Sequence, residues 1–577
     1  MTEWEFSDGG GSDGGAGGGE GAASAFAALS GRIVDGLLAH DPVSATWLGE
    51  HSYDDRLPDA SPEGLGAALG TVEAALTAVD QVDDVALPVS AVVDLEILRN
   101  ALDLERLTIE VLRPHSWDPL VANPGTSIHL LLARDFAPLE DRLRSVAGRL
   151  AAVPEALAQA RAALHDMPRV HVETAIGQFQ GTQAMLERQL ADELAAAPAA
   201  RGGVEPARIV ALEALDEHVA WLRASLDDAH GDPRLGEEKY AAKLWVALDA
   251  QLTPDDVLHR AEEHLARVEG EIARAAAAYL GEQVPPPDDA GPVVRRALDA
   301  VAADGPVDDS TVLPMCRAAF DDTRDFIVEH GLVTVFGDPV DIVEMPEIHR
   351  GVAVAYCDAP GPLETTPLPT FFAVSPTPAG WDDARVASFY REDNAHMLQN
   401  LTIHEAMPGH VLQFEHLRRM ADRSRVRETF VSGSFAEGWA VYAEQLMAER
   451  GYAPRSAADR DRAALAIRLQ QLKMQLRMTI NAILDVRVHA RGMTEAEAMR
   501  LMQVRGHQED GEAVGKWRRA LLTSTQLSTY FVGFVGVNDV VADVRAAYPR
   551  WSDREVHDSV LGHGAPPPRH LRALLGV

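Results

Sequence analysis

The segment His-Glu-Ala-Met-Pro-Gly-His at residues 404–410 contains the residue types of a hydrolytic metal site. Zinc in such a site takes three protein ligands from histidine and carboxylate side chains and keeps one position open for water. A glutamate next to the first histidine can then take a proton from that water. His404 and Glu405 stand in this order. The segment therefore predicts metal-assisted hydrolysis, with zinc as the metal.

The second histidine stands six residues after the first, whereas a zinc-peptidase helix usually places it four residues after. On a regular helix, six residues rotate a side chain by about 600° and advance it by roughly 9 Å, so His404 and His410 could not share one ion. Pro408 lacks the N–H that would bond to the carbonyl of His404, and Gly409 accepts backbone angles closed to other residues. We predict that this pair breaks the helix and returns His410 to His404. The alternative is a helix that simply ends at Met407.

A third ligand is expected from the segment SGSFAEGWAVYAEQLMAE at 432–449. Glu437 and Glu444 are seven residues apart, which places them on one helix face opposite an apolar stripe. A carboxylate from a second helix completes a His-His-Glu site. Ser434 and Glu437 also match a capping box, in which the glutamate reaches back to the serine N–H. With the histidine motif upstream, we favour ligation by Glu437. The stripe consists of Phe435, Trp439, Tyr442 and Leu446.

The overall charge limits the choice of partner and compartment. The chain has 52 basic and 88 acidic residues, a formal net charge of −36. Nucleic acid and anionic membranes repel such a surface, so neither is expected as a partner. The N-terminus lacks the basic and apolar regions of a signal peptide, and no run of about 18 apolar residues suggests a membrane span. Cys316 and Cys357 cannot build a disulfide framework and fit a reducing compartment. We therefore expect a cytoplasmic protein.

Composition divides the chain into three regions. Residues 1–22 are rich in glycine, serine and acidic residues, which predicts a flexible tail. Apolar residues recur at helical spacing over 23–325, which predicts an N-terminal helical lobe. Residues 326–577 are expected to form the metal-bearing lobe, and the two lobes to form one integrated unit. Three β-type runs predict a small sheet or hairpin: GLVTVF (331–336), GVAVAYCDA (351–359) and PTFFAVSP (369–376).

The two motifs resemble a known bacterial family. H-E-A-M-P-G-H followed by E-G-W-A-V-Y-A-E is similar to the signature H-E-x-x-P-G-H and E-G-W-A-x-Y-x-E of domain of unknown function number eight hundred and eighty-five. The segment HDPVSATWLGEHSYDDRLPDASPEG is similar to the family's opening, so the resemblance covers most of the chain. The family is thought to contain zinc-peptidase-like proteins, distantly similar to helical gluzincins such as angiotensin-converting enzyme. The resemblance implies a mainly α, two-lobed metallopeptidase-like fold with a central cleft and a small β-sheet or hairpin.

The resemblance also implies roles for the motif residues. By position, His404, His410 and Glu437 are the implied zinc ligands, and Glu405 is the implied general base. Glu444 is implied as a further carboxylate, which either contacts one of the ligands or serves as an alternative ligand. These five residues are all present in the sequence, so the motifs are intact.

Two later stretches match the family in part, and they concern the substrate pocket. The family's Asp-Thr-Gly-Ile-His is kept only at Asp485 and His489, and a later stretch keeps Tyr530 but loses its Pro-Gly. A peptide hydrolase needs a hydrogen-bond donor for its oxyanion, and His489 and Tyr530 are the candidates. The alternatives are a helix-capping histidine and a core tyrosine. Arg477 is a candidate to bind a substrate carboxylate, or a structural ion-pair partner.

The sequence thus predicts a zinc-dependent metallopeptidase that cleaves short peptides through a zinc-activated water, with Glu405 as base. The expected partner is a peptide or amide substrate. One alternative is a zinc amidohydrolase acting on a non-peptide metabolite. The other is an inactive helical binding protein in which Glu437 caps its helix.

Overall fold

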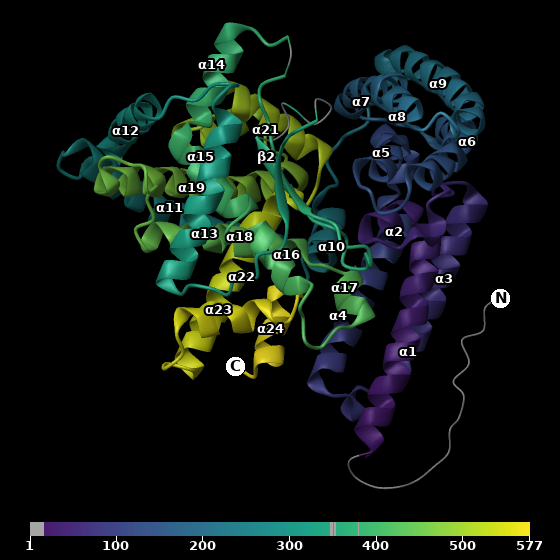
Figure 1. Cartoon of the computed structure of the whole chain (residues 1–577), viewed down its shortest axis with the longest axis horizontal. Helices are drawn as coiled ribbons and strands as arrows, with labels where there is room; N and C mark the ends of the chain where they lie inside the picture. The colour runs from purple at the N-terminus through teal and green to yellow at the C-terminus, as the bar shows by residue number, and fades with distance from the viewer. Residues whose placement is uncertain (1–16, 347–349, 351–353, 379) are drawn as a thin grey trace. The chain divides into compact units, whose positions relative to one another are not determined.

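The computed structural model describes residues 17–346, 350, 354–378 and 380–577. These residues are mainly α-helical and include one three-stranded sheet (Figure 1), as the sequence predicts. The chain forms two compact units. The first contains Met1–Pro233 together with the later segments Pro360–Leu368 and Asp422–Phe430, and the second contains the rest.

The first unit is helical over its described residues. Its largest core cluster gathers the buried apolar faces of α5, α6, α7 and α9, including Leu131, Leu150, Phe179 and Leu215. The 25-residue helix α6 matches one of the helical patterns that the sequence shows most clearly. The bounds are α1 (Gly17–His40), α2 (Pro42–Leu48), α3 (Pro62–Asp80), α4 (Val89–Leu107), α5 (Gly125–Ala133), α6 (Leu139–Ala163), α7 (Arg169–Glu187), α8 (Gln189–Ala196), α9 (Arg201–Ala224) and α17 (Arg425–Thr429).

The predicted flexible tail is too long at its C-terminal end. Residues 1–16 lie outside the described residues, but α1 begins at Gly17 and therefore includes the last six residues of the predicted tail. Two features favour this early start. The following residues are rich in alanine, the best helix former, and Glu20 lies in the first turn, where the helix dipole stabilises an acidic side chain.

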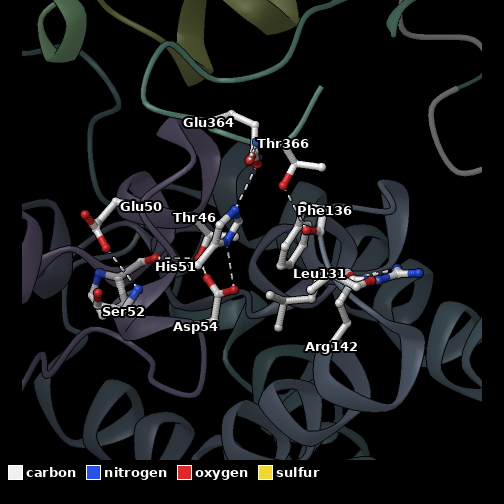
Figure 2. Close-up of polar contacts among 12 residues, drawn as sticks. Thr46, Glu50, His51, Ser52, Asp54, Leu131, Phe136, Arg142, Glu364 and Thr366 are labelled. Carbon is white, nitrogen blue, oxygen red and sulfur yellow. Dashed lines mark hydrogen bonds and ion pairs between the residues drawn. The ribbon is translucent and has the colours of Figure 1, made fainter. Parts of the chain in front are cut away.

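The segment Pro360–Leu368 belongs to the first unit through contacts with the start of the chain. Figure 2 shows His51 between two carboxylates, with Nδ1 at 2.9 Å from Asp54 Oδ2 and Nε2 at 3.0 Å from Glu364 Oε2. The imidazole also stacks on Phe136 at 3.9 Å between ring centroids. A doubly protonated imidazole can donate to both carboxylates at once, so this arrangement favours the charged form of His51.

We expect the stability contributed by His51 to depend on pH. Burial lowers the pKa of His51, but the hydrogen bonds to Asp54 and Glu364 outweigh it and raise this pKa above its ordinary value. A raised folded-state pKa gives stability that is complete below the unfolded pKa of about 6.5 and is lost as pH rises through the folded pKa. A His51→Gln variant should therefore unfold with roughly 1 kcal/mol less free energy near pH 6, and the difference should shrink at higher pH.

Urea unfolding across pH measures this difference. His165→Gln is the matched control, because His165 also faces an aspartate, Asp166, but is 66% exposed. A gap between the parent and His51→Gln that stays constant with pH would show that the charge of His51 contributes nothing.

The second unit is built around the long helices α11 and α19. Helix α11 (Pro254–Leu280) shows why the sequence signal is strong: Thr253 and Asp256 form a capping box, and Gly281 ends the helix at φ +69°. Its apolar residues repeat every three or four positions and are buried in the core of this unit. The buried stripe includes Val257, Ala261, Leu265, Val268 and Ile272.

The boundary between the units lies at residues 233 and 234 and not near residue 325. The reason is packing, since the buried faces of α10 to α13 join the core cluster of the second unit. The remaining bounds are α10 (Glu237–Leu248), α12 (Ala290–Asp304), α13 (Val312–His330), α14 (Asp383–Glu392), α15 (Ala395–Glu405), α16 (His410–Leu417), α18 (Gly433–Glu449), α19 (Arg460–Arg491), α20 (Glu495–Arg500), α21 (Asp510–Leu522), α22 (Gln526–Ala547), α23 (Asp553–Leu561) and α24 (Pro568–Leu575).

The sheet has the order β1-β3-β2, so β2 is an edge strand. Strand β1 (Val340–Glu344) runs parallel to β3 (Thr370–Val374), and β2 (Ala355–Asp358) runs antiparallel to β3. Strands β2 and β3 lie within two of the three predicted runs, and residues 351–353 of one run lie outside the described residues.

The predicted strand at 331–336 is wrong. Leu332 and Val333 are buried in the core cluster without forming a strand. The backbone N–H of Thr334 donates to Asp558, and that of Phe336 donates to Glu415. Side-chain carboxylates thus accept the backbone N–H groups that would otherwise pair with a neighbouring strand. The prediction failed because a short apolar run that is buried in a loop has the same sequence pattern as a strand.

Candidate metal centre

The helix that carries the histidine motif breaks between its two histidines. Helix α15 ends at Glu405 and α16 begins at His410. Between them the backbone turns widen, since the N–H of Met407 donates to the carbonyl of Thr402, five residues back. The imidazole rings of His404 and His410 consequently lie 4.9 Å apart between centroids, at 89° to each other. The structure brings the two rings together as the sequence predicts.

Two residues hold this break in place. The indole N–H of Trp439, which is fully buried on α18, donates to the carbonyl of Pro408 at 2.8 Å. A Cβ atom at Gly409 would lie 1.8 Å from the carbonyl oxygen of His404. Gly409 has φ −73°, so it is needed here for the close approach of two backbone segments and not for a left-handed conformation. The sequence therefore predicts correctly that Gly409 matters at the break, but the structural reason is close packing and not unusual backbone angles.

Helix α18 presents Glu437 to both imidazoles. Glu437 Oε2 lies 3.3 Å from His404 Nε2 and 3.8 Å from His410 Nε2, and one ligand atom from each of the three side chains lies within 4.8 Å of the others. Atoms that each bind zinc at about 2 Å stand roughly 3–4 Å apart. Glu437 Oε2 is also buried without a hydrogen-bond partner among the described residues. The donor set and this unpaired oxygen fit a divalent metal.

The electrostatics of Glu437 reflect the same arrangement. Burial raises the pKa of its carboxyl group, but the neighbouring imidazoles of His404 and His410 outweigh burial. The pKa is therefore held far below its ordinary value. The carboxylate is ionised, as a metal ligand must be.

The capping-box alternative for Glu437 is excluded by the start of α18. The N-cap residue is Ser432, whose hydroxyl accepts from the N–H of Phe435 at 3.2 Å. Ser434, the expected cap, instead donates its hydroxyl to the carbonyl of Leu248. Within the described part of the chain Glu437 therefore caps no backbone N–H at the start of α18, and its carboxylate lies beside the two histidines.

Glu444 lies behind His404, on the side away from Glu437. His404 Nδ1 donates to Glu444 Oε1 at 2.7 Å, and Asn400 Nδ2 donates to Glu444 Oε2 at 2.6 Å. With Nδ1 bound to Glu444, His404 Nε2 is the ring atom that faces Glu437 and the candidate metal position. Our sequence reasoning missed Asn400, although its place four residues before His404 puts both on one helix face.

A Glu444→Gln variant should bind zinc about 10–100-fold more weakly, because the amide supports His404 less well than a carboxylate does. Competition with a chromophoric chelator measures the dissociation constant. Glu449→Gln is the control, since Glu449 is exposed on the same helix. Equal zinc affinity in the parent and Glu444→Gln would show that Glu444 does not orient the ligand.

Glu405 follows the first histidine and is held by the sheet. Its Oε2 accepts from the backbone N–H of Cys357, on edge strand β2, at 3.0 Å. Burial raises the pKa of the Glu405 carboxyl group, and the charges of His404 and His410 oppose this effect. A raised carboxyl pKa moves toward the range in which a group both accepts and returns a proton at neutral pH.

Tyr530 lies on α22, close enough to Glu437 of the candidate metal centre for the charge of that glutamate to act on its phenol. Helices α18 and α22 touch where Gly438 meets Gly533, since a Cβ at Gly438 would lie 2.3 Å from the carbonyl carbon of Gly533. Tyr530 is one turn before Gly533, and Glu437 adjoins Gly438. Burial and then the charge of Glu437 raise the pKa of the Tyr530 phenol, which stays protonated. Its hydroxyl accepts from Arg519 at 3.4 Å.

His489 and Asp485 hydrogen-bond to the end of α21 and the start of α22. His489 Nε2 lies 2.9 Å and 2.8 Å from the carbonyl oxygens of Ala520 and Thr523. Asp485 accepts from the backbone N–H and the hydroxyl of Ser528, in the first turn of α22. His489 Nε2 is therefore occupied by carbonyls at the end of α21, which the oxyanion-donor prediction did not foresee, and Asp485 anchors the start of α22, the helix that carries Tyr530.

Arg477 is occupied by an acidic neighbour. Its Nε lies 2.7 Å from Glu512 Oε1, so the structure supports the ion-pair alternative for this arginine. A different arginine, Arg519, contacts the hydroxyl of Tyr530, and the sequence did not point to it. No spacing in the sequence relates α21 to α22, and only the packed helices bring these two side chains together.

Fold and site together define a mainly helical protein with a candidate His-His-Glu metal centre. The family model described as bacterial protein of unknown function (DUF885) matches residues 42–575, and the chain belongs to this family. No curated protein matches the chain.

Solved structures are similar over nearly the whole chain. One, described as "a putative lipoprotein of unknown function from Shewanella oneidensis", superposes with a TM-score of 0.80 at 28% identity, covering 96% of this chain and 100% of that one. Another, described as "the putative lipoprotein from Colwellia psychrerythraea", gives a TM-score of 0.76 at 15% identity, covering 96% and 98%. Metallocarboxypeptidase 1 of Trypanosoma cruzi gives a TM-score of 0.35 at 12% identity, covering 96% and 95%, which is too low to support an argument.

The expectation of a cytoplasmic protein is wrong. Both similar structures are described as lipoproteins. Within the described residues, Glu20–His40 and Gln526–Ala547 are also long and apolar enough to cross a membrane, judged by length and composition alone. The second of these is α22, whose buried face belongs to the core of its unit. The expectation rested on the lack of an unbroken apolar run, whereas average hydropathy over a window identifies such helices.

Proposed function

We propose that this protein is a zinc-dependent metallopeptidase that hydrolyses short peptides. The observation that carries the proposal is the buried, unpaired oxygen of Glu437, which faces the Nε2 atoms of His404 and His410. Glu405 adjoins this group in the chain, as the general base of a hydrolytic site should. His404, His410 and Glu437 would hold the metal.

Zinc in such a site acts as a Lewis acid and lowers the pKa of water. Glu405 would take the proton of the attacking water on its carboxylate and later deliver it to the leaving amine. The N–H of Cys357 fixes one carboxylate oxygen of Glu405 and leaves the other available for this proton. The protonated phenol of Tyr530 would donate to the oxyanion that forms on the scissile carbonyl.

We also infer an envelope-associated location. The support is the description of the two similar structures as lipoproteins and the apolar helix Glu20–His40 near the N-terminus. Substrates would then be peptides present at the cell envelope. Fractionation of cells that express the full chain tests this location.

Elemental analysis and a peptide digest of the purified full chain test the function. We expect about one zinc per chain, and cleavage of short peptides that stops with a chelator and returns with added zinc. Cleavage of non-peptide amides with no cleavage of peptides would favour the amidohydrolase alternative. A protein that takes up no zinc on titration would contradict the proposal and favour a binding protein.

A further inference from the structure

A cluster of cationic side chains lies beside Tyr530, on α19 and α21 of the second unit. Two of its members are paired with acids. Lys473 Nζ lies 2.7 Å from the Glu392 carboxylate, and Arg477 Nε lies 2.7 Å from Glu512 Oε1. These two pairs are largely buried, and each is electrically balanced.

The other two cations, Lys516 and Arg519, stand one turn apart on α21 and have no such partner. The Lys516 side chain is 7% exposed, and its amino group makes no ion pair or hydrogen bond within the described part of the chain. Arg519 donates to Gln526 Oε1 at 2.8 Å and to the Tyr530 hydroxyl at 3.4 Å, and both acceptors are neutral. Neither cation therefore has a carboxylate of its own.

The charges around Lys516 do not balance. Burial, and then the positive charges of Arg477 and Arg519, lower the pKa of Lys516 well below its ordinary value. Glu512, already paired with Arg477, is the acid that opposes this effect. The nearby Asp393 does not compensate, because burial raises its pKa to about 8 and keeps it protonated at neutral pH. The charged form of a buried amine without a counter-charge is unfavourable, and an arriving anion beside Lys516 and Arg519 would stabilise it.

We propose that Lys516 and Arg519 bind a carboxylate of the substrate, next to the scissile bond. The position follows from the contact of Arg519 with Tyr530, whose helix packs against the Glu437 helix where Gly438 meets Gly533. Guanidinium and ammonium groups together bind a carboxylate through charge-assisted hydrogen bonds. The carboxylate is the free C-terminus of a peptide or an acidic side chain. This assignment rests on the proposed peptidase function and specifies its substrate class.

Three matched peptides test the subsite on the zinc-loaded full chain: a neutral peptide with a free C-terminus, its C-terminal amide, and the amide with glutamate as its last residue. We expect kcat/KM for the free acid to exceed kcat/KM for the neutral amide about 50-fold, because hydrogen bonds to a charged carboxylate contribute a factor of this size. Lys516→Met and Arg519→Gln should bring this ratio close to one. Arg518→Gln, an exposed neighbour on α21, should keep the ratio of the parent.

The outcomes separate the subsite from the peptidase function. Preference for the glutamyl amide over the neutral amide, lost in both variants, would assign the carboxylate to a side chain. Equal cleavage of all three peptides would overturn the subsite and leave the peptidase standing. If no peptide is cleaved, titration calorimetry with benzoylglycine and benzoylglycinamide decides. Tighter binding of the acid, abolished by Lys516→Met, supports the subsite, and equal binding overturns it.

Discussion

A Glu405→Gln variant should keep its zinc and lose about 10³-fold in kcat, the usual worth of a general base. The amide has the shape of the carboxylate, and its oxygen can still accept from the N–H of Cys357, so the local fold should survive. It cannot take a proton from water at neutral pH. Steady-state kinetics on a cleaved peptide, with zinc measured on the same sample, gives both quantities.

The control for this variant is Glu449→Gln, which makes the same chemical change at an exposed position of α18. Loss of zinc together with activity in Glu405→Gln would show that the residue acts by supporting the ligands. Unchanged kcat with full zinc occupancy would remove Glu405 from the reaction, and another base would be required.

The local geometry of the candidate metal centre was predictable because each part of it is set within a short stretch of the chain. Pro408 and Gly409 break the helix within the motif, and the seven-residue spacing places Glu437 and Glu444 on one face of α18. Each of these statements needs the geometry of a single helix. The zinc-ligand roles stay predictions. The approach of Glu437 to the two histidines depends on the packing of α18 against the motif, and the histidine motif with the family resemblance, rather than residue spacing, implied it.

The pocket around the centre was not predictable in the same way. Tyr530 and Arg519 meet because α21 and α22 pack together, and His489 is bound to backbone carbonyls that lie more than thirty residues later in the chain. Residue spacing within one helix carries no information on contacts between side chains of different helices. The same limit explains the boundary at residue 233, since helices before and after it have similar amphipathic patterns and differ only in which core receives them.

The ligand role of Glu437 has the second large effect. A Glu437→Gln variant should bind zinc at least about 100-fold more weakly, because a four-ligand structural zinc site contributes roughly 10–16 kcal/mol, or about 3 kcal/mol for each ligand. A neutral amide oxygen is also a poorer partner for a dication than a carboxylate. Zinc titration against a competing chelator measures the loss, and peptide hydrolysis should fall with it.

Comparison of Glu437→Gln with Ser432→Ala separates metal ligation by Glu437 from a role of Glu437 in helix stability. Ser432, and not Ser434 or Glu437, caps α18. Ser432→Ala should therefore lower the free energy of unfolding by about 1 kcal/mol and leave zinc affinity nearly unchanged. Glu437→Gln should weaken zinc binding and leave the cap of α18 unchanged, because Ser432 and not Glu437 accepts the backbone N–H of Phe435 at the helix start. If Glu437→Gln instead destabilised the zinc-free fold and left zinc affinity intact, the glutamate would be structural and the metal centre would lack its third ligand.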